Sequence, residues 1–235
     1  MSVRNFSNRT RSRPGNQESG HRPKSHPSDT DQTRQHIAET AARIMAEEGV
    51  SDFHAAKRKA ADRLGVPESK HLPGNDEVHS ALQLYLQLFH SGQLSQNLQR
   101  LRQLAADGMR FLEKFDPRLV GSVLSGTVTA TTEIHLHITA DTPEEVGLWL
   151  DEYHIPHEQS DRRLRFGGDR HETFPTYHFT ADGIPVELCV FDRRNGRETP
   201  LSSVDGKPMK RANLKEVEGL VMQTSNPAKT KGKIC

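Results

Sequence analysis

Polar side chains recur at every second position of an apolar stretch near the middle of the chain. Glu133, His135 and His137 alternate there with three aliphatic residues, which predicts a half-buried strand. Side chains two residues apart on a strand point to the same face and lie about 6.5 Å apart. A carboxylate and an imidazole at that spacing can share one metal ion, although the solvent-facing side of a half-covered sheet gives the same alternation.

A third candidate ligand lies in a later apolar run. Glu187 is the one charged residue within residues 185–191, which read as a second strand. We therefore expect Glu133, His135 and Glu187 to converge on neighbouring strands and to form a metal site.

A turn of small residues precedes the first of these strands. Leu119 and Val120 are followed by Gly121 and Ser122, and a second glycine, Gly126, comes shortly afterwards. On its own, a glycine–serine pair is typical of a tight turn. Because the pair comes just before the alternating strand, we expect the turn to lie beside the site that this strand carries.

The order of these features resembles the polymerase-beta-type nucleotidyltransferase superfamily. The family motif has a Gly-Ser pair, an Asp-x-Asp on the next strand and one more Asp on a later strand. These positions fall on Gly121–Ser122, on Glu133 and His135, and on Glu187. Residues 32–222 further resemble proteobacterial nucleotidyltransferase-like proteins that are sometimes labelled UDP-N-acetylmuramate–alanine ligases. A chain of 235 residues is too short for a three-domain ligase of that kind.

The resemblance implies both a fold and a reaction. It implies that Gly121, Ser122 and Gly126 bind the phosphates of a nucleoside triphosphate. It also implies that Glu133 and Glu187 are catalytic carboxylates that hold Mg²⁺ or Mn²⁺, with Zn²⁺ as a further candidate. The reaction would transfer a nucleoside monophosphate to an acceptor that the sequence does not identify.

Departures from the motif keep a second function open. Glu133 and Glu187 stand where the family has Asp, and His135 removes a negative charge from the position that should bridge the metal ions. Imidazole is a poor ligand for Mg²⁺, which prefers oxygen ligands in octahedral geometry. The alternative is therefore a catalytically inactive module of the same fold that binds nucleotide or RNA.

Arginines gather in the segment between the two strands. Arg162, Arg163, Arg165 and Arg170 lie within nine residues of one another. Guanidinium groups bind phosphates in bidentate geometry, so we expect Arg165 and Arg170 to contact the nucleotide. An exposed strand edge kept soluble by charge is the alternative interpretation.

The rest of the sequence supplies the elements that position these residues. Residues 31–114 contain four stretches with apolar residues at helical spacing, whereas strand-like and helical stretches alternate after Pro117. We expect an α/β (α+β) protein with four parts: a disordered basic arm (1–30), a helical domain (31–115), a nucleotidyltransferase-like mixed-sheet domain (116–222) and a flexible basic tail (223–235).

Positive charge is concentrated at the two ends of the chain. Residues 1–30 carry six basic and two acidic residues, and residues 223–235 carry three lysines and no acid, although the whole chain has a net charge of only +1. Basic, polar arms can bind RNA through its phosphates. The alternative is a solvated arm without a partner.

Composition also bears on location. No apolar run approaches the roughly 20 residues of a membrane helix, and the N-terminus lacks the apolar core of a secretory signal. The two cysteines, Cys189 and Cys235, are too few for a disulfide framework or a cysteine-based zinc site. We therefore expect a cytoplasmic protein without a membrane partner, in which Cys189 is a core thiol.

Overall fold

The computed structural model describes residues 29–67, 72–89, 91–193 and 198–224. The predicted basic arm and tail fall almost wholly outside these residues. The α-helices are α1 (Asp29–Glu48), α2 (Phe53–Leu64), α3 (Asn75–Phe89), α4 (Ser91–Phe111), α5 (Gly121–Ser125), α6 (Pro143–Glu152) and α7 (Leu214–Thr224). The strands are β1 (Arg118–Val120), β2 (Ile134–Ala140), β3 (Glu158–Arg165), β4 (His171–Ala181) and β5 (Ile184–Asp192), and two short 3₁₀ helices are η1 (Glu113–Phe115) and η2 (Gly167–Asp169). None of the helices in the described ranges is long and apolar enough to cross a membrane.

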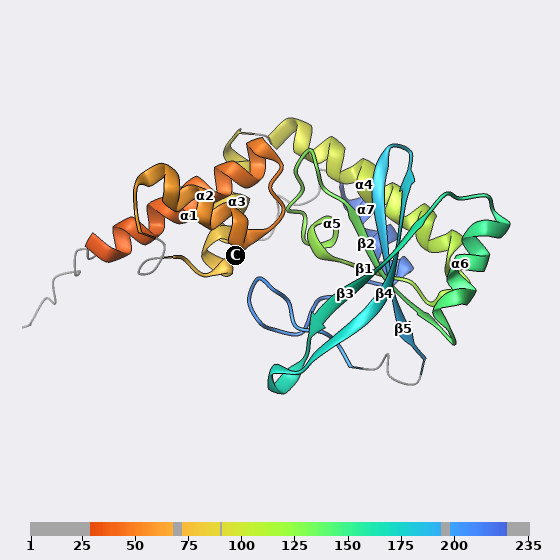
Figure 1. Ribbon diagram of the computed structural model, residues 1–235. Coiled ribbons are helices and arrows are strands. Elements are labelled where there is room, and N and C mark those ends of the chain that lie inside the picture. Colours follow the sequence, from red (N-terminus) through yellow and green to blue (C-terminus); the bar gives the residue numbers. More distant parts are fainter. Residues whose placement is uncertain (1–28, 68–71, 90, 194–197, 225–235) are drawn as a thin grey trace, which may run out of the picture.

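Helices α1, α2 and α3 pack around a core of their own (Figure 1). Ile44 on α1 and Leu82 on α3 are among its buried residues, as the helical spacing of apolar residues predicts. Helix α2 is capped by Asp52, whose Oδ1 accepts a hydrogen bond from the Ala55 backbone N–H at 2.7 Å.

Helix α4 packs on the sheet. Leu101 and Met109 of this helix are buried in the same hydrophobic cluster as Leu136 on β2 and Leu188 on β5. Buried residues of α1, α2 and α3 thus form one hydrophobic cluster, and those of α4 belong to the cluster of the sheet. The domain boundary near residue 115 stays a prediction. Apolar periodicity shows that a helix has a buried face, but it does not show which partner covers that face.

The five strands form one mixed sheet in the order β1-β2-β5-β4-β3. Strands β2 and β5 are parallel, and the other neighbours are antiparallel. A tight turn joins β4 to β5, with positive φ angles of 50° at Asp182 and 75° at Gly183. The strand pairing confirms the mixed sheet that the sequence predicted.

The two faces of the sheet differ in chemistry. One face is apolar, because residues such as Ile134 and Leu188 share a buried cluster with residues of α4, α6 and α7. Alternate residues of β2 and β5, among them His135 and Glu187, occupy the other face. The helices that stabilise the sheet therefore lie on one face. The other, which we call the polar face, carries these polar residues together with a small buried cluster of Leu164, Phe166, Cys189 and Phe191.

A segment over residues 198–213 links the two edges of the sheet. The Leu201 N–H donates to the Arg165 carbonyl on β3 at 2.7 Å, and Leu119 on β1 exchanges two backbone hydrogen bonds of 2.9 Å with Ala212. Residues 208–213, which follow a turn over residues 203–207, are not helical. Helix α7 begins at Leu214, after a capping box in which Asn213 and Glu216 bond to each other's backbone N–H.

Candidate functional site

His135 and Glu187 are partners across two neighbouring parallel strands. The Nδ1 atom of His135 lies 3.2 Å from Oε1 of Glu187, a hydrogen bond in which the imidazole N–H donates to the carboxylate. The Glu187 side chain is largely buried, at 11% exposure. The structure thus brings together two of the three residues that the sequence predicted for a metal site.

Arg162 on β3 completes this pair from the other side. Its Nη1 donates to the same Glu187 oxygen, Oε1, and lies 3.5 Å from His135 Nδ1. Because β4 separates β3 from β5, the long guanidinium side chain reaches across the whole width of one strand. The result is a compact set of one carboxylate, one imidazole and one guanidinium, which we call the His135–Glu187–Arg162 cluster.

The cluster holds Glu187 in its ionised form. Burial by itself would raise the pKa of this carboxyl, but the hydrogen bond from His135 and the positive charge of Arg162 outweigh that effect and lower the pKa to about 2. The carboxylate is therefore charged, paired and hydrogen-bonded at neutral pH, as a buried charge must be.

The Gly121–Ser122 turn lies against this cluster. Val120, the last residue of β1, is paired with His135, and a Cβ placed on Gly121 would lie 3.4 Å from the His135 ring atom Cδ2. Gly121 has a φ of 75°, in the region that favours glycine. The turn continues into the single-turn helix α5, where the sequence predicted a loop.

Gly126 closes that helix. It has a φ of 84°, and its N–H donates to the Ser122 carbonyl at 2.8 Å. The adjacent Thr127 N–H donates to the same carbonyl at 3.0 Å. Gly126 thus shapes the turn that carries Ser122. Its contact with a nucleotide stays a prediction.

Glu133 lies apart from the cluster. It is exposed and precedes the first residue of β2. In the part of the chain that the structure describes, no hydrogen bond or ion pair joins Glu133 to His135 or Glu187. The same part of the chain contains no group of three or more His, Cys, Asp or Glu side chains placed to hold a metal ion.

The cluster does not fit a divalent metal ion as the resemblance would require. One oxygen of the Glu187 carboxylate, Oε1, accepts hydrogen bonds from both Arg162 and His135. A guanidinium beside that oxygen also repels a second cation. In addition, His135 Nδ1 carries the hydrogen that it donates to Glu187, so this nitrogen has no lone pair for a metal.

The two predicted phosphate-binding arginines occupy other places. Arg165 lies three residues beyond Arg162 on β3, so strand alternation turns its side chain to the opposite face of the sheet. Arg170 is exposed and forms ion pairs with Glu172, at 2.8 Å, and with Glu198. Neither arginine is joined by a hydrogen bond to Glu187, whereas Arg162, which belongs to the same run in the sequence, is.

A second polar group lies beside the cluster and was not found from the sequence. The Ser160 hydroxyl lies 2.7 Å from the Thr176 hydroxyl and 2.8 Å from His178 Nε2. His178 is paired with Glu187 across β4 and β5, so these residues extend the polar face toward β3. Thr176 and His178 are two residues apart, the same spacing as His135 and His137, and that spacing was the available signal.

His137 and Cys189 differ from the polar residues beside them. His137 is 5% exposed, and burial, followed by the charge of Arg211, lowers its pKa to about 3. Cys189 is 1% exposed, and burial raises the pKa of its thiol to about 12. Cys189 is therefore a protonated core thiol, as the sequence predicted, and His137 is a neutral imidazole.

No match was found when the chain was compared with models of protein families, with curated proteins and with solved structures. The functional reading therefore depends on the residues and geometry described above.

Proposed function

We propose that this protein is a nucleotide-binding module with a degenerate nucleotidyltransferase-like site, and that it binds the phosphates of a nucleotide without a divalent metal ion. The observation that carries the proposal is the contact of Arg162 with Glu187. The guanidinium sits at the carboxylate that would hold a metal ion in an active nucleotidyltransferase. It therefore supplies a fixed positive charge of the protein's own.

The charge and geometry of Arg162 suit this role. A guanidinium has five N–H donors, and the Arg162 side chain is 40% exposed while Nη1 contacts Glu187. The remaining donors can bind phosphate oxygens in bidentate geometry. Glu187 would then orient the guanidinium, and it would have no part in holding a metal.

The nucleotide would lie over the polar face of the sheet. Gly121 lies beside the His135 ring at one side of that face, with Ser122 next in the chain, and Ser160 and His178 extend the face on the other side. Backbone N–H groups and a serine hydroxyl at one end, with a guanidinium near the middle, are suitable donors for a chain of phosphates. We propose Ser122 and Arg162 as the principal phosphate contacts.

Metal-dependent transfer of a nucleoside monophosphate from a triphosphate is the competing proposal. One observation favours it, namely that the Gly121–Ser122 turn lies against His135, in the order that the family motif would require. It would use Glu133 and Glu187 with Mg²⁺ or Mn²⁺ and would require Arg162 to leave Glu187. Binding of RNA through residues 1–30 and 223–235 is a separate prediction, which falls almost entirely on residues outside the described ranges.

Substitution of Arg162 tests the proposal. Binding of ATP, GTP, CTP and UTP would be measured by calorimetry in EDTA for the natural protein, for Arg162→Gln and for Arg163→Gln. Arg163 is an exposed neighbour on the opposite face of β3, so it controls for loss of charge. We expect Arg162→Gln to weaken binding by about tenfold or more and Arg163→Gln to leave it unchanged. Equal weakening by both variants would contradict the proposal.

A further inference from the structure

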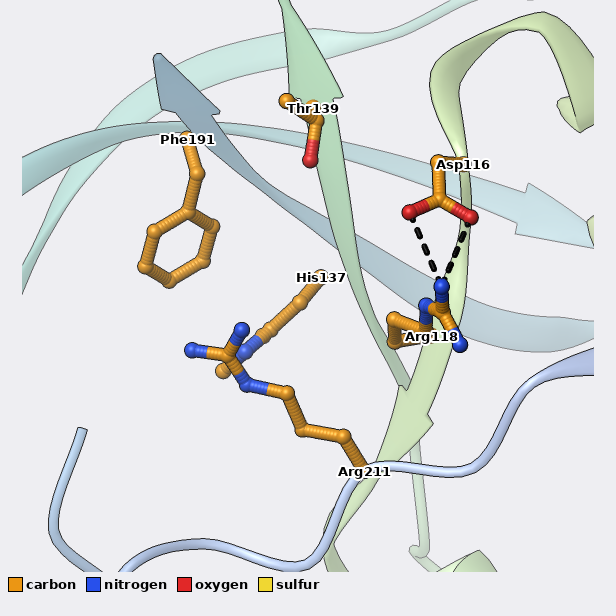
Figure 2. Close-up of a pocket in the computed structure, with 6 residues that line it drawn as sticks. All are labelled: Asp116, Arg118, His137, Thr139, Phe191 and Arg211. Atoms are coloured by element: carbon orange, nitrogen blue, oxygen red, sulfur yellow. Dashed lines mark hydrogen bonds and ion pairs between the residues drawn. The ribbon is translucent and has the colours of Figure 1, made fainter. Parts of the chain in front are cut away.

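A cavity of about 240 Å³ lies at one end of the polar face. Figure 2 shows the side chains that line it, which are Asp116, Arg118, His137, Thr139, Phe191 and Arg211. They come from β1 and the turn before it, from β2, from β5 and from the segment 198–213 that links the sheet edges. Its lining includes none of the residues in the His135–Glu187–Arg162 cluster.

The cavity lining carries two guanidinium groups and one carboxylate. Arg118 Nη2 lies 3.0 Å from both carboxylate oxygens of Asp116, so these two charges offset each other. Arg211 adds the second guanidinium, half-buried, whose Nη2 donates to the Glu198 backbone carbonyl at 3.0 Å. The lining side chains therefore include one more basic group than acidic groups.

One wall of the cavity is aromatic. The Phe191 ring lies 5.2 Å from the Arg211 guanidinium carbon and 4.8 Å from the His137 ring. A guanidinium over an aromatic face is held in place by a cation–π interaction. Arg211 is therefore positioned beside a flat apolar surface, which can contact the organic part of a ligand.

His137 presents an unused hydrogen-bonding atom to this cavity. Its side chain is buried, with 5% of the residue exposed, and Figure 2 shows it beside the Arg211 guanidinium. Its Nδ1 has no hydrogen-bond partner among the described residues. A buried polar atom without a partner destabilises the folded state, so its presence beside two arginines suggests a ligand that supplies the missing hydrogen bond.

We propose that this cavity binds a small organic oxyanion, a phosphate monoester or a carboxylate. Arg211 and Arg118 would bind the oxyanion, His137 Nδ1 would form the hydrogen bond that it lacks, and Phe191 would contact the organic group. The volume is below the roughly 300–1,000 Å³ of cavities for drug-sized ligands, which restricts the ligand to a small molecule. The proposal does not depend on nucleotide binding at the His135–Glu187–Arg162 cluster.

Calorimetric titration with phenyl phosphate, benzoate and inorganic phosphate, in EDTA, tests this site. We expect one molecule of phenyl phosphate or of benzoate to bind per chain, more tightly than inorganic phosphate. Tighter binding of phenyl phosphate would identify the monoester, and tighter binding of benzoate the carboxylate. Arg211→Gln should weaken the preferred probe by about tenfold, while Arg100→Gln, which removes an exposed arginine paired with Asp182, should have no effect.

The variant His137→Phe provides a second, independent test of the proposal. It keeps an aromatic ring beside Phe191 but removes the buried nitrogen, so we expect weaker probe binding together with an unchanged or higher melting temperature. Absence of binding by all three probes at millimolar concentration would overturn the proposal, as would equal affinities of Arg211→Gln and the natural protein. Loss of binding in Arg162→Gln but not in Arg211→Gln would place the anion at the other cluster and would also overturn it.

Discussion

Arg162 on β3 contacts Glu187 on β5 across the intervening strand β4. Their strands are not neighbours in the sheet, so only a long side chain that lies along the polar face can join the two residues. His135 approaches the same carboxylate oxygen from β2. Three strands thus converge on one oxygen atom, and the position at which a metal ion would be expected is taken by a guanidinium.

Removal of Arg162 should expose a latent metal site. In Arg162→Gln the Glu187 carboxylate loses its positive partner, and we expect measurable Mn²⁺ binding that the natural protein lacks. Adding His135→Asp supplies a second carboxylate and should extend binding to Mg²⁺. Calorimetric titration with each metal measures this, with Arg163→Gln as the charge control. Metal binding by the natural protein that matches the variants would show that Arg162 does not block the site.

The acid stability of the protein should depend on Glu187. Its pKa is about 2 in the folded protein and about 4.5 when unperturbed, so the stability that it contributes is complete above pH 4.5 and is lost as the pH falls toward 2. Glu187→Gln should lower the free energy of unfolding by about 2 kcal/mol at pH 7. This is less than the pKa shift alone would imply, because solvent screens the partly exposed Arg162.

Urea denaturation at pH 7, 4.5 and 3, without divalent metals, measures that effect. The difference between the natural protein and Glu187→Gln should shrink as the pH falls from 4.5 to 3. His137, whose lowered pKa makes stability fall between pH 6.5 and about 3, is present in both proteins. Because burial and Arg211 affect the pKa of His137 more than the charge of Glu187 does, most of this loss is common to the two proteins. A constant difference over this range would mean that Glu187 is not held ionised by its partners.

Glu133 separates the two functional proposals. It is exposed and outside the cluster, so metal-independent binding predicts that Glu133→Gln leaves nucleotide affinity unchanged or slightly improved through reduced charge repulsion. Metal-dependent transfer predicts that the same change abolishes turnover and metal binding. Nucleotide affinity in EDTA and pyrophosphate release with Mg²⁺, measured on one preparation of this variant, distinguish the two.

Gly121 should be sensitive to any side chain. Its φ of 75° is strained for an L-amino acid, and a Cβ would contact His135 at 3.4 Å. Gly121→Ala should lower stability by about 1 kcal/mol and weaken nucleotide binding by displacing the turn. Gly183→Ala is a matched control, since that glycine also has a φ of 75° but lies in a distant, open turn. It should lose similar stability but keep nucleotide binding.

The sequence predicted which residues lie on the polar face of the sheet more reliably than it predicted which side chains contact them. Alternation around His135 and the apolar run around Glu187 were sufficient to place both residues on strands. Parallel pairing of those strands with these two residues opposite each other confirmed that they converge. Glu133 shared the parity of His135, but the strand begins at Ile134, and the sequence pattern does not indicate where pairing ends.

The contacts of Arg162 and His137 could not be predicted from the sequence, because they depend on pairing between segments that are distant in the chain. Arg162 was one of several arginines in a run, and only the order of β3, β4 and β5 distinguishes it from Arg165 on the opposite face. His137 had the same alternation as His135, yet it is buried in a cavity lined by Arg211. That arginine comes from the segment 198–213, which is distant from His137 in the sequence.

Binding of a nucleoside triphosphate in the absence of metal tests the central claim most directly. ATP, GTP, CTP and UTP would each be titrated calorimetrically into the full chain in EDTA and again with Mg²⁺ or Mn²⁺, and pyrophosphate release would be followed in parallel. We predict that at least one nucleotide binds in EDTA, with an affinity that the metals do not increase and without release of pyrophosphate. Binding that requires a divalent metal, or pyrophosphate release that depends on one, would contradict the account.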